Sequence, residues 1–437
     1  MSEIREQIKL AIPLAAQQVG FQLMGTVDAA WLGRYNNTAI AAAGVGNNLL
    51  FAITAIGLGV IMGMESVVPK AIGAGRPEDA RRYFHAGLRL ALIVGLASTL
   101  LVIASPHILT LADVDKDVAH DARIYIYLRS VGVIPFLLQV AFRGYLAARG
   151  ITRPLVLAVV LGNIANFFLD WLLIFGSSKL GIPALGILGA ALATVSVQVV
   201  IIGTYFLAVR IVDKGQPLPR STKADMKEIV KYGAPVGGQL FAEVGIFGVS
   251  TVVAAHLGKV PAAAHSIALN LCSFTFSIAM GIGAATSVRV GHAVGAWDIP
   301  LARRRGWIGM ALGLIVMGVG AIALVAVPSH IAALLTDQSD TITATVPLLM
   351  IAAVFQLSDG TQAIAAGALR GFGNTRATLV GNIVGHYGVG LAISLSLAFA
   401  AGMGVVGLWW GLSAGLTATA LYLVLRFAQA TANQKSD

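Results

Sequence analysis

Long stretches of apolar residues constrain the fold of this chain more than any other feature of its sequence. A helix needs about 20 apolar residues to cross the hydrocarbon core of a bilayer, and twelve segments reach that length. They lie near residues 8–33, 42–70, 85–109, 122–147, 153–176, 183–210, 228–257, 263–291, 303–330, 344–368, 377–400 and 404–427. Only 11% of the residues are charged, against about 25% in soluble proteins. The sequence therefore predicts an all-α polytopic membrane protein with twelve transmembrane helices.

The positions of lysine and arginine predict how the chain is oriented. Cytoplasmic loops of membrane proteins gather positive charge. With the N-terminus inside, 24 of the 30 basic residues fall on cytoplasmic segments. The other six are Arg34, Lys116, Arg123, Arg129, Lys179 and Lys259. We expect a multi-pass protein of a bacterial or archaeal-type cytoplasmic (inner) membrane with both termini in the cytoplasm. The net charge of +10 then reflects these loops and indicates no nucleic-acid partner.

The two halves of the chain resemble each other at a nearly constant offset. Shifts of 222 or 223 residues superpose Gly59 on Gly281, Gly73-Ala74 on Gly295-Ala296, Ala80-Arg81-Arg82 on Ala302-Arg303-Arg304, Gly144 on Gly367 and Thr152-Arg153 on Thr375-Arg376. Each half has six predicted spans, so both halves begin on the same side of the membrane. We expect two six-helix lobes, 1–211 and 228–437, related by a pseudo-two-fold axis along the membrane normal and joined by a cytoplasmic linker over 212–227. This repeat favours a carrier that works by alternating access over a channel.

Five of the 20 acidic residues lie inside apolar spans. A carboxylate there costs at least about 2.5 kcal/mol, so each needs a structural or functional reason. They are Asp28, Glu65, Asp170, Glu243 and Asp359. We expect Glu65, near the cytoplasmic end of its span, to be a structural partner in helix packing. A basic residue also lies inside a span, and we expect Arg129 to extend outward to the membrane interface.

Oxygen-bearing side chains accompany the acids in both halves. Asn163, Asn166 and Asp170 have the spacing i, i+3, i+7 and share one face of the fifth predicted helix. Such a stripe offers hard oxygen ligands to a small cation; alternatively, burial favours the protonated form of the carboxyl group. In the second half, Gln239 and Glu243 are one turn apart, and Asp359 and Gln362 share one face of the tenth predicted helix.

Several short motifs resemble those of the multidrug and toxic compound extrusion (MATE) transporters. They are Val27-Asp28-Ala29-Ala30-Trp31-Leu32-Gly33-Arg34, Ala71-Ile72-Gly73-Ala74-Gly75, the run from Leu185 to Thr194, Phe355-Gln356-Leu357-Ser358-Asp359, Gly367-Ala368-Leu369-Arg370-Gly371, and the run from Gly404 to Gly411. They occur in the order typical of that family and cover essentially the whole chain. One departure is Lys70, where the family usually has glutamine.

The resemblance implies a cation site in the first lobe. Its family pattern is an Asp on helix one, an Asn and an Asp one turn apart on helix five, and a Thr on helix six. The matching positions here are Asp28, Asn166, Asp170 and Thr194. Such a set favours Na⁺, which would bind at Asp28, Asn166 and Asp170; H⁺ is the alternative.

The resemblance also implies a second acidic site. Glu243 and Asp359, with Gln239 and Gln362 beside them, match acids that the NorM-type branch of the family uses for cation coupling or for binding cationic substrates. Both acid sets are present, so the sequence leaves open which lobe couples.

A MATE-like chain is expected to be a secondary active antiporter that exports amphipathic, cationic drugs or toxic metabolites in exchange for Na⁺ or H⁺. The alternatives are a flippase for a lipid-linked precursor and an exporter of one specific endogenous metabolite; the acidic membrane residues disfavour an anionic cargo. The sequence shows no catalytic constellation, so we do not expect an enzyme, and we expect no cofactor besides the coupling ion. The single cysteine, Cys272, excludes an intramolecular disulfide. The expected partners are an amphipathic small molecule and the lipid bilayer, and we expect a monomer.

Overall fold

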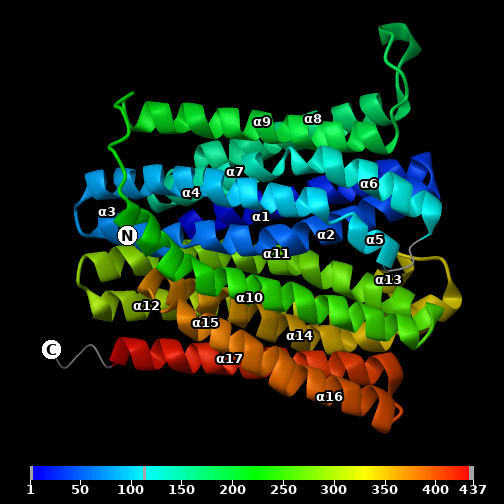
Figure 1. The fold of residues 1–437 in the computed structure, drawn as a ribbon. Coiled ribbons are helices and arrows are strands. Elements are labelled where there is room, and N and C mark those ends of the chain that lie inside the picture. The colour runs from blue at the N-terminus through cyan, green and yellow to red at the C-terminus, as the bar shows by residue number, and fades with distance from the viewer. Residues whose placement is uncertain (1–2, 112–114, 433–437) are drawn as a thin grey trace. The chain divides into compact units, whose positions relative to one another are not determined.

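The computed structural model describes residues 3–111 and 115–432, and these are mostly helical (Figure 1). Lys435, which entered the charge count above, lies outside the described residues. The first half contains α1 (Glu3–Tyr35), α2 (Asn37–Met62), α3 (Met64–Gly73), α4 (Pro77–Ala104), α5 (His107–Leu111), α6 (Lys116–Ser130), α7 (Val133–Ala148), α8 (Arg153–Phe175), η1 (Ser178–Leu180) and α9 (Ile187–Val212). The second half contains α10 (Lys223–His256), α11 (Lys259–Gly295), α12 (Ile299–Ala326), α13 (Pro328–Ala333), α14 (Ser339–Phe372), α15 (Thr375–Asn382), η2 (Ile383–Leu391), α16 (Ala392–Leu395), η3 (Ser396–Ala400) and α17 (Gly404–Ala432).

By length and composition, ten helices in the described part of the chain can cross a membrane, and an eleventh span is the bent pair α6–α7. The helix α1 is 33 residues long, but Gln17, Gln18 and Gln22 lower the hydropathy of its apolar stretch. Each of the twelve predicted spans coincides with a helix or a broken helix. The all-helical polytopic fold predicted from the sequence is therefore confirmed.

One predicted span, near 122–147, is broken in the structure. It consists of α6 and α7, which meet at an angle of 47°. Pro135 lies in the first turn of α7 and has no N–H to continue the hydrogen bonds of α6. The hydrogen bond from Phe136 N to Gly132 O, 2.9 Å long, begins the new helix.

The chain forms two compact units that do not follow chain order strictly. Unit 1 combines Met1–Ala15, Pro69–Gly75 and Gly238–Asp437, and unit 2 combines Ala16–Val68 and Arg76–Gly237. The first turns of α1 therefore pack with the second half of the sequence, and the first turns of α10 pack with the first half. The lobes expected from the sequence lack this exchange of segments.

Glycines explain why the exchanged segments pack where they do. In unit 2, a Cβ atom on Gly59 would lie 2.2 Å from the backbone nitrogen of Gly237. In unit 1, a Cβ atom on Gly281 would lie 2.3 Å from the Cα atom of Ala15. Only glycine permits such close helix contacts. Gly59 and Gly281 superpose in the sequence repeat, so each half provides a glycine against the first helix of the other half.

The helix α10 begins at Lys223, before the predicted start near residue 228. The reason is a capping box formed by Thr222 and Asp225. The backbone nitrogen of Thr222 donates to Asp225 Oδ2 at 2.7 Å, and the backbone nitrogen of Asp225 donates to Thr222 Oγ1 at 3.2 Å. The connection between α9 and α10 is therefore shorter than the predicted linker.

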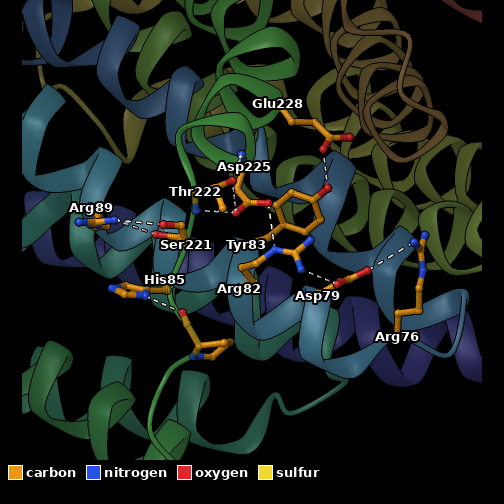
Figure 2. Close-up of polar contacts among 11 residues, drawn as sticks. Arg76, Asp79, Arg82, Tyr83, His85, Arg89, Ser221, Thr222, Asp225 and Glu228 are labelled. Carbon is orange, nitrogen blue, oxygen red and sulfur yellow. Dashed lines mark hydrogen bonds and ion pairs between the residues drawn. The ribbon is translucent and has the colours of Figure 1, made fainter.

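This connection and the start of α10 are fixed to α4 within unit 2 (Figure 2). Arg89 donates to the carbonyl oxygen of Ser221 at 3.2 Å, and a ring nitrogen of His85 lies 2.7 Å from the carbonyl oxygen of Pro219. Arg82 Nε donates to Asp225 Oδ1 at 3.0 Å. These bonds hold residues 219–225 against one face of α4.

Glycines also set the packing of α11 against α14 in unit 1. A Cβ atom on Gly367 would lie 2.3 Å from the carbonyl oxygen of Gly283, and one on Gly371 would lie 2.2 Å from that of Ser287. The two glycines of α14 are four residues apart, the spacing of small residues at close helix contacts in membranes. Gly144, which the repeat superposes on Gly367, has no atom within 4 Å of the corresponding Cβ position.

We expect Gly367→Ala to lower the free energy of unfolding by about 1–3 kcal/mol, because the methyl group overpacks the contact with α11. Gly144→Ala is the matched control and should leave stability unchanged or raise it by about 0.5–1 kcal/mol, since alanine favours a helix more than glycine does. Thermal unfolding in detergent measures both. Equal effects of the two substitutions would contradict the close contact.

Candidate functional site

The four residues that match the family's first cation site lie together in unit 2. Asp28 belongs to α1, Asn166 and Asp170 to α8, and Thr194 to α9. Asn166 Nδ2 donates to Asp28 Oδ1 at 2.8 Å, and Thr194 Oγ1 donates to Asp28 Oδ2 at 3.1 Å. All four side chains are buried. We call these residues the N-site.

A close contact between α8 and α9 helps to position the N-site. A Cβ atom on Gly189 would lie 2.4 Å from the backbone of Leu173, so a larger residue would separate the two helices. Gly189 precedes Thr194 on α9, and Leu173 follows Asp170 on α8. The glycine therefore keeps the threonine hydroxyl within reach of the acids.

Asp170 has an unusual set of neighbours for a fully buried carboxyl group. It interacts with both Asp28 and Asn166, yet neither of its oxygens accepts a hydrogen bond from a donor among the described residues. The side-chain oxygen of Asn166 is also buried without a donor. Two carboxylates cannot hydrogen-bond each other unless one of them is protonated. The N-site thus presents acceptor oxygens that a cation or a proton would satisfy.

The structure corrects the expected direction of Arg129. Its guanidinium group lies 5.7 Å from the centre of the Tyr125 ring, and Nη2 lies 3.5 Å from Oδ1 of Asn47. Its Nε and Nη1 atoms are buried without an acceptor among the described residues. The side chain therefore turns into unit 2 instead of outward, because the aromatic face of Tyr125 and the Asn47 amide receive it there. It is close enough to interact electrostatically with Asp170.

Asn163 has different partners from the rest of the predicted stripe. Its Nδ2 atom donates to the carbonyl oxygen of Gly20 at 3.0 Å and to that of Val159 at 2.9 Å. These bonds tie α8 to α1, two turns before Asp170. The structure thus brings Asn166 and Asp170 to the N-site and gives Asn163 a packing contact.

Glu65 lies in an ion pair within unit 2. Arg143 Nη2 is 3.4 Å from Glu65 Oε1, and Arg143 Nη1 donates to Gln18 Oε1 at 2.8 Å. Both charged side chains are largely buried. This pairing agrees with the structural role that the sequence suggested for Glu65.

The acids of the second half meet in unit 1. Gln362 Nε2 on α14 donates to Glu243 Oε1 on α10 at 3.2 Å, and Gln239 also interacts with Glu243. Asp359 interacts electrostatically with Glu243 and is buried. We call these four residues the C-site. Unlike Asp170, Glu243 has an amide donor.

Two buried polar residues near the C-site were not singled out as site residues from the sequence. Asn382 is 0% exposed and His386 is 1% exposed, and both Asn382 amide atoms and His386 Nε2 have no hydrogen-bond partner among the described residues. His386 lies in the π-helix η2, with its ring 6.3 Å from that of Phe247 on α10, one turn after Glu243. A π-helical turn has no simple sequence pattern. The only sequence signal was the four-residue spacing of these side chains.

Two sequence-related halves built of membrane-length helices, each with buried acids, are typical of a polytopic membrane transporter. The MatE family model matches residues 13–172 and again 235–396. The second match begins 222 residues after the first, the offset found in the sequence repeat. The chain belongs to the MATE family and is a multidrug efflux transporter, not an enzyme.

Curated relatives agree over the whole length. The chain is 33% identical over 440 residues to the probable multidrug resistance protein NorM of Deinococcus radiodurans, covering 98% of this chain and 96% of that protein. It is 32% identical to the probable NorM of Bradyrhizobium diazoefficiens, covering 97% and 93%. It is 30% identical to the multidrug resistance protein NorM of Aliivibrio fischeri, covering 97% and 94%.

Solved structures share the fold. A multidrug resistance MATE transporter of the MOP superfamily in an outward-facing conformation matches with a TM-score of 0.88 and 20% identity, over 100% of this chain and 98% of that one. A MOP superfamily transporter from Pyrococcus furiosus matches with a TM-score of 0.90 and 19% identity over the same shares. For that protein, reverse polarity of the binding pocket suggests a different function. The arrangement of helices is therefore common to these transporters.

The Glu65–Arg143 pair can be tested by a double-mutant cycle. We expect Glu65→Leu or Arg143→Met alone to lower the free energy of unfolding by about 3–5 kcal/mol, because each leaves a buried charge without its partner. The double variant should lose much less than the sum, since no charge is left behind. Thermal or chemical unfolding in detergent measures the cycle. Additive losses would show that the two side chains do not depend on each other.

Proposed function

We propose that this transporter is a secondary active antiporter that exports amphipathic cationic compounds in exchange for Na⁺ or H⁺. The observation that supports it best is the N-site, where Asp170 and Asn166 present buried oxygens that have no hydrogen-bond donor. Uncompensated acceptors in a low-dielectric interior are costly. An incoming cation removes that cost, so ion binding at this place is favourable.

We propose that the N-site is the coupling site and that Na⁺ is its preferred ion. Asp28, Asn166, Asp170 and Thr194 offer carboxylate, amide and hydroxyl oxygens, which suit a hard cation. In the described part of the chain no three His, Cys, Asp or Glu side chains converge, so mixed oxygen donors are the available ligands. A proton shared by Asp28 and Asp170 is the alternative occupant, because it would let one carboxyl group donate to the other.

We propose that the C-site binds the positive group of the exported compound. Gln362 already donates to Glu243 and Gln239 interacts with it, so its negative charge is partly stabilised without an ion. Asp359 lies beside it and adds a second negative charge. A buried acid pair attracts a cationic compound and disfavours an anionic one.

Antiport then follows from competition within one alternating-access cycle. We propose that lobes 1–211 and 228–437 alternately open to the two sides, with both termini in the cytoplasm of an inner membrane and one chain as the transporting unit. An ion bound from outside and a cationic substrate bound from inside penalise each other electrostatically. Each therefore promotes release of the other.

A flippase for a lipid-linked precursor, or an exporter of one specific endogenous metabolite, is the second candidate. The fold alone does not separate these functions, since a structurally similar transporter has a pocket of reversed polarity. The acidic C-site argues against an anionic headgroup as cargo. A specific cationic metabolite would fit the same site.

The coupling site can be identified by transport measurements in inverted vesicles. We expect wild type to transport a fluorescent cationic dye when either a Na⁺ or an H⁺ gradient is imposed separately, with a larger response to Na⁺. Asp170→Asn removes one carboxylate of the N-site and should lower the apparent affinity for the driving ion about tenfold or more. Asp359→Asn should raise the apparent KM for the dye, because it removes a charge from the substrate site.

Glu65→Gln serves as a control for loss of a buried acid outside both sites, with transport normalised to the amount of folded protein because the loss of the partner of Arg143 lowers stability. It should leave both the ion dependence and the dye KM close to wild type. Unchanged ion dependence in Asp170→Asn would overturn coupling at the N-site. An ion-affinity loss in Asp359→Asn without a change in KM would move the coupling role to the C-site.

A further inference from the structure

The turn between α11 and α12 contains a tryptophan in an unfavourable conformation. Trp297 has a φ of 59° and is 88% exposed. Its backbone nitrogen donates to Val294 O at 3.1 Å, and that of Asp298 donates to Ala293 O at 2.9 Å. These two bonds form a Schellman motif with Trp297 at the left-handed position, which is usually glycine.

The equivalent turn in the first half shows that this turn can form without a side chain. A shift of 222 residues places Gly75 on Trp297, and Gly75 also has a positive φ, 70°. The equivalent turn therefore forms with glycine and with no side chain. In the second half, Trp297 exposes a large aromatic side chain to solvent and has an unfavourable backbone conformation. Packing inside the protein therefore does not explain this tryptophan.

Two arginines near this turn also differ from their counterparts. Arg303 and Arg304 are exposed and have no hydrogen bond or ion pair among the described residues. Their repeat equivalents are bonded: Arg81 donates to Gln216 at 2.8 Å, and Arg82 pairs with Asp225 at 3.0 Å.

Nearby acids make their hydrogen bonds and ion pairs with other groups, and Glu3 interacts with Arg304 only electrostatically. Asp298 Oδ1 accepts the backbone N–H of Leu301 at 2.9 Å and caps α12. Glu3 accepts from Arg305 Nε at 2.9 Å and also pairs with Arg289. The two exposed guanidinium groups are therefore open to an external anion.

The same face of α12 continues into an apolar surface. Trp307 follows Arg303 by four residues and Arg304 by three, so it neighbours both arginines on the surface of α12, and it is 39% exposed. Farther along α12, the exposed apolar residues are Leu314, Ile315, Val319, Ile322 and Val325. The order of arginine, tryptophan and apolar residues is typical of a helix that passes from the headgroups into the hydrocarbon core.

We propose that Trp297, Arg303, Arg304 and Trp307 form a binding site for the headgroup of an anionic phospholipid. The two guanidinium groups suit a phosphate, which they can bind through paired N–H groups. The indole of Trp307 lies at the boundary of the hydrocarbon core, and that of Trp297 covers the headgroup from the aqueous side. This site is separate from the N-site and the C-site, so it does not depend on the proposed transport cycle.

The test uses the full chain in detergent with mixed micelles that contain fluorescent phosphatidylglycerol, and phosphatidylcholine as the neutral comparison. Wild type should bind phosphatidylglycerol more tightly than phosphatidylcholine. Arg303→Gln/Arg304→Gln should weaken phosphatidylglycerol binding about fivefold for each arginine. Trp297→Gly restores the residue of the other half; it should weaken binding about threefold or more while leaving or raising the thermal stability without lipid.

Lys223→Gln/Lys227→Gln removes two other exposed basic charges and is the matched control. It should retain wild-type lipid binding. An equal loss of lipid binding in this control would show that only the net charge of the protein matters and would overturn the proposed site. Unchanged phosphatidylglycerol binding in both test variants would also overturn the proposed site. Displacement of the lipid by inorganic phosphate at equal concentration would overturn it as well, because the site would then recognise the free anion. Dye export in neutral lipid should stay at the wild-type level in all three variants, which separates this test from that of the transport function.

Discussion

Buried polar groups must find partners inside the protein, because lipid offers them none, and this constraint shapes most of the structure. Glu65 is paired with Arg143, and Glu243 accepts a hydrogen bond from the amide of Gln362. Asp170 differs from these two acids: it is fully buried beside Asp28, and neither of its oxygens accepts a hydrogen bond from a donor among the described residues. A deficit of this kind is costly in a low-dielectric interior. It is therefore best explained by an ion or proton that binds and leaves during function.

Glycine contacts determine which helices can place these polar groups together. Gly189 lets α9 approach α8, which brings Thr194 to Asp28. Gly59 and Gly281 occupy equivalent positions in the repeat and each contacts the first helix of the opposite half. The exchanged segments of α1 and α10 thus follow from the same rule in both units. Close backbone packing supplies most of the helix association that hydrophobicity cannot provide in a membrane.

The sequence predicted the helices because hydropathy depends on local composition. The site residues were expected from the acid positions and from the resemblance to the MATE family, and of these Asn163 makes a packing contact with Gly20 instead. The sequence also predicted that Asn166 and Asp170 share a face, since helical spacing is fixed. It did not predict the direction of Arg129, because a long side chain can reach either the interface or the interior. The break at Pro135 had a local signal in the proline, which the hydropathy pattern does not register. The π-helix around His386 was missed because a π-helical turn has no simple sequence pattern. The sequence contains the Thr222–Asp225 capping pattern that starts α10 before residue 228. A hydropathy profile does not reveal this pattern.

The two halves share a fold and differ in the chemistry placed on it. At the N-site the oxygens of Asp170 have no hydrogen-bond donor among the described residues, whereas at the C-site the Gln362 amide donates to Glu243. At the turns, Gly75 in one half stands where Trp297 stands in the other. Equivalent backbones with different polar groups imply that the repeat fixes helix packing and leaves side chains free to specialise. In the antiporter proposed above, this asymmetry lets the N-site favour the ion and the C-site favour the positive group of the substrate, so each site binds one of the two partners that exchange.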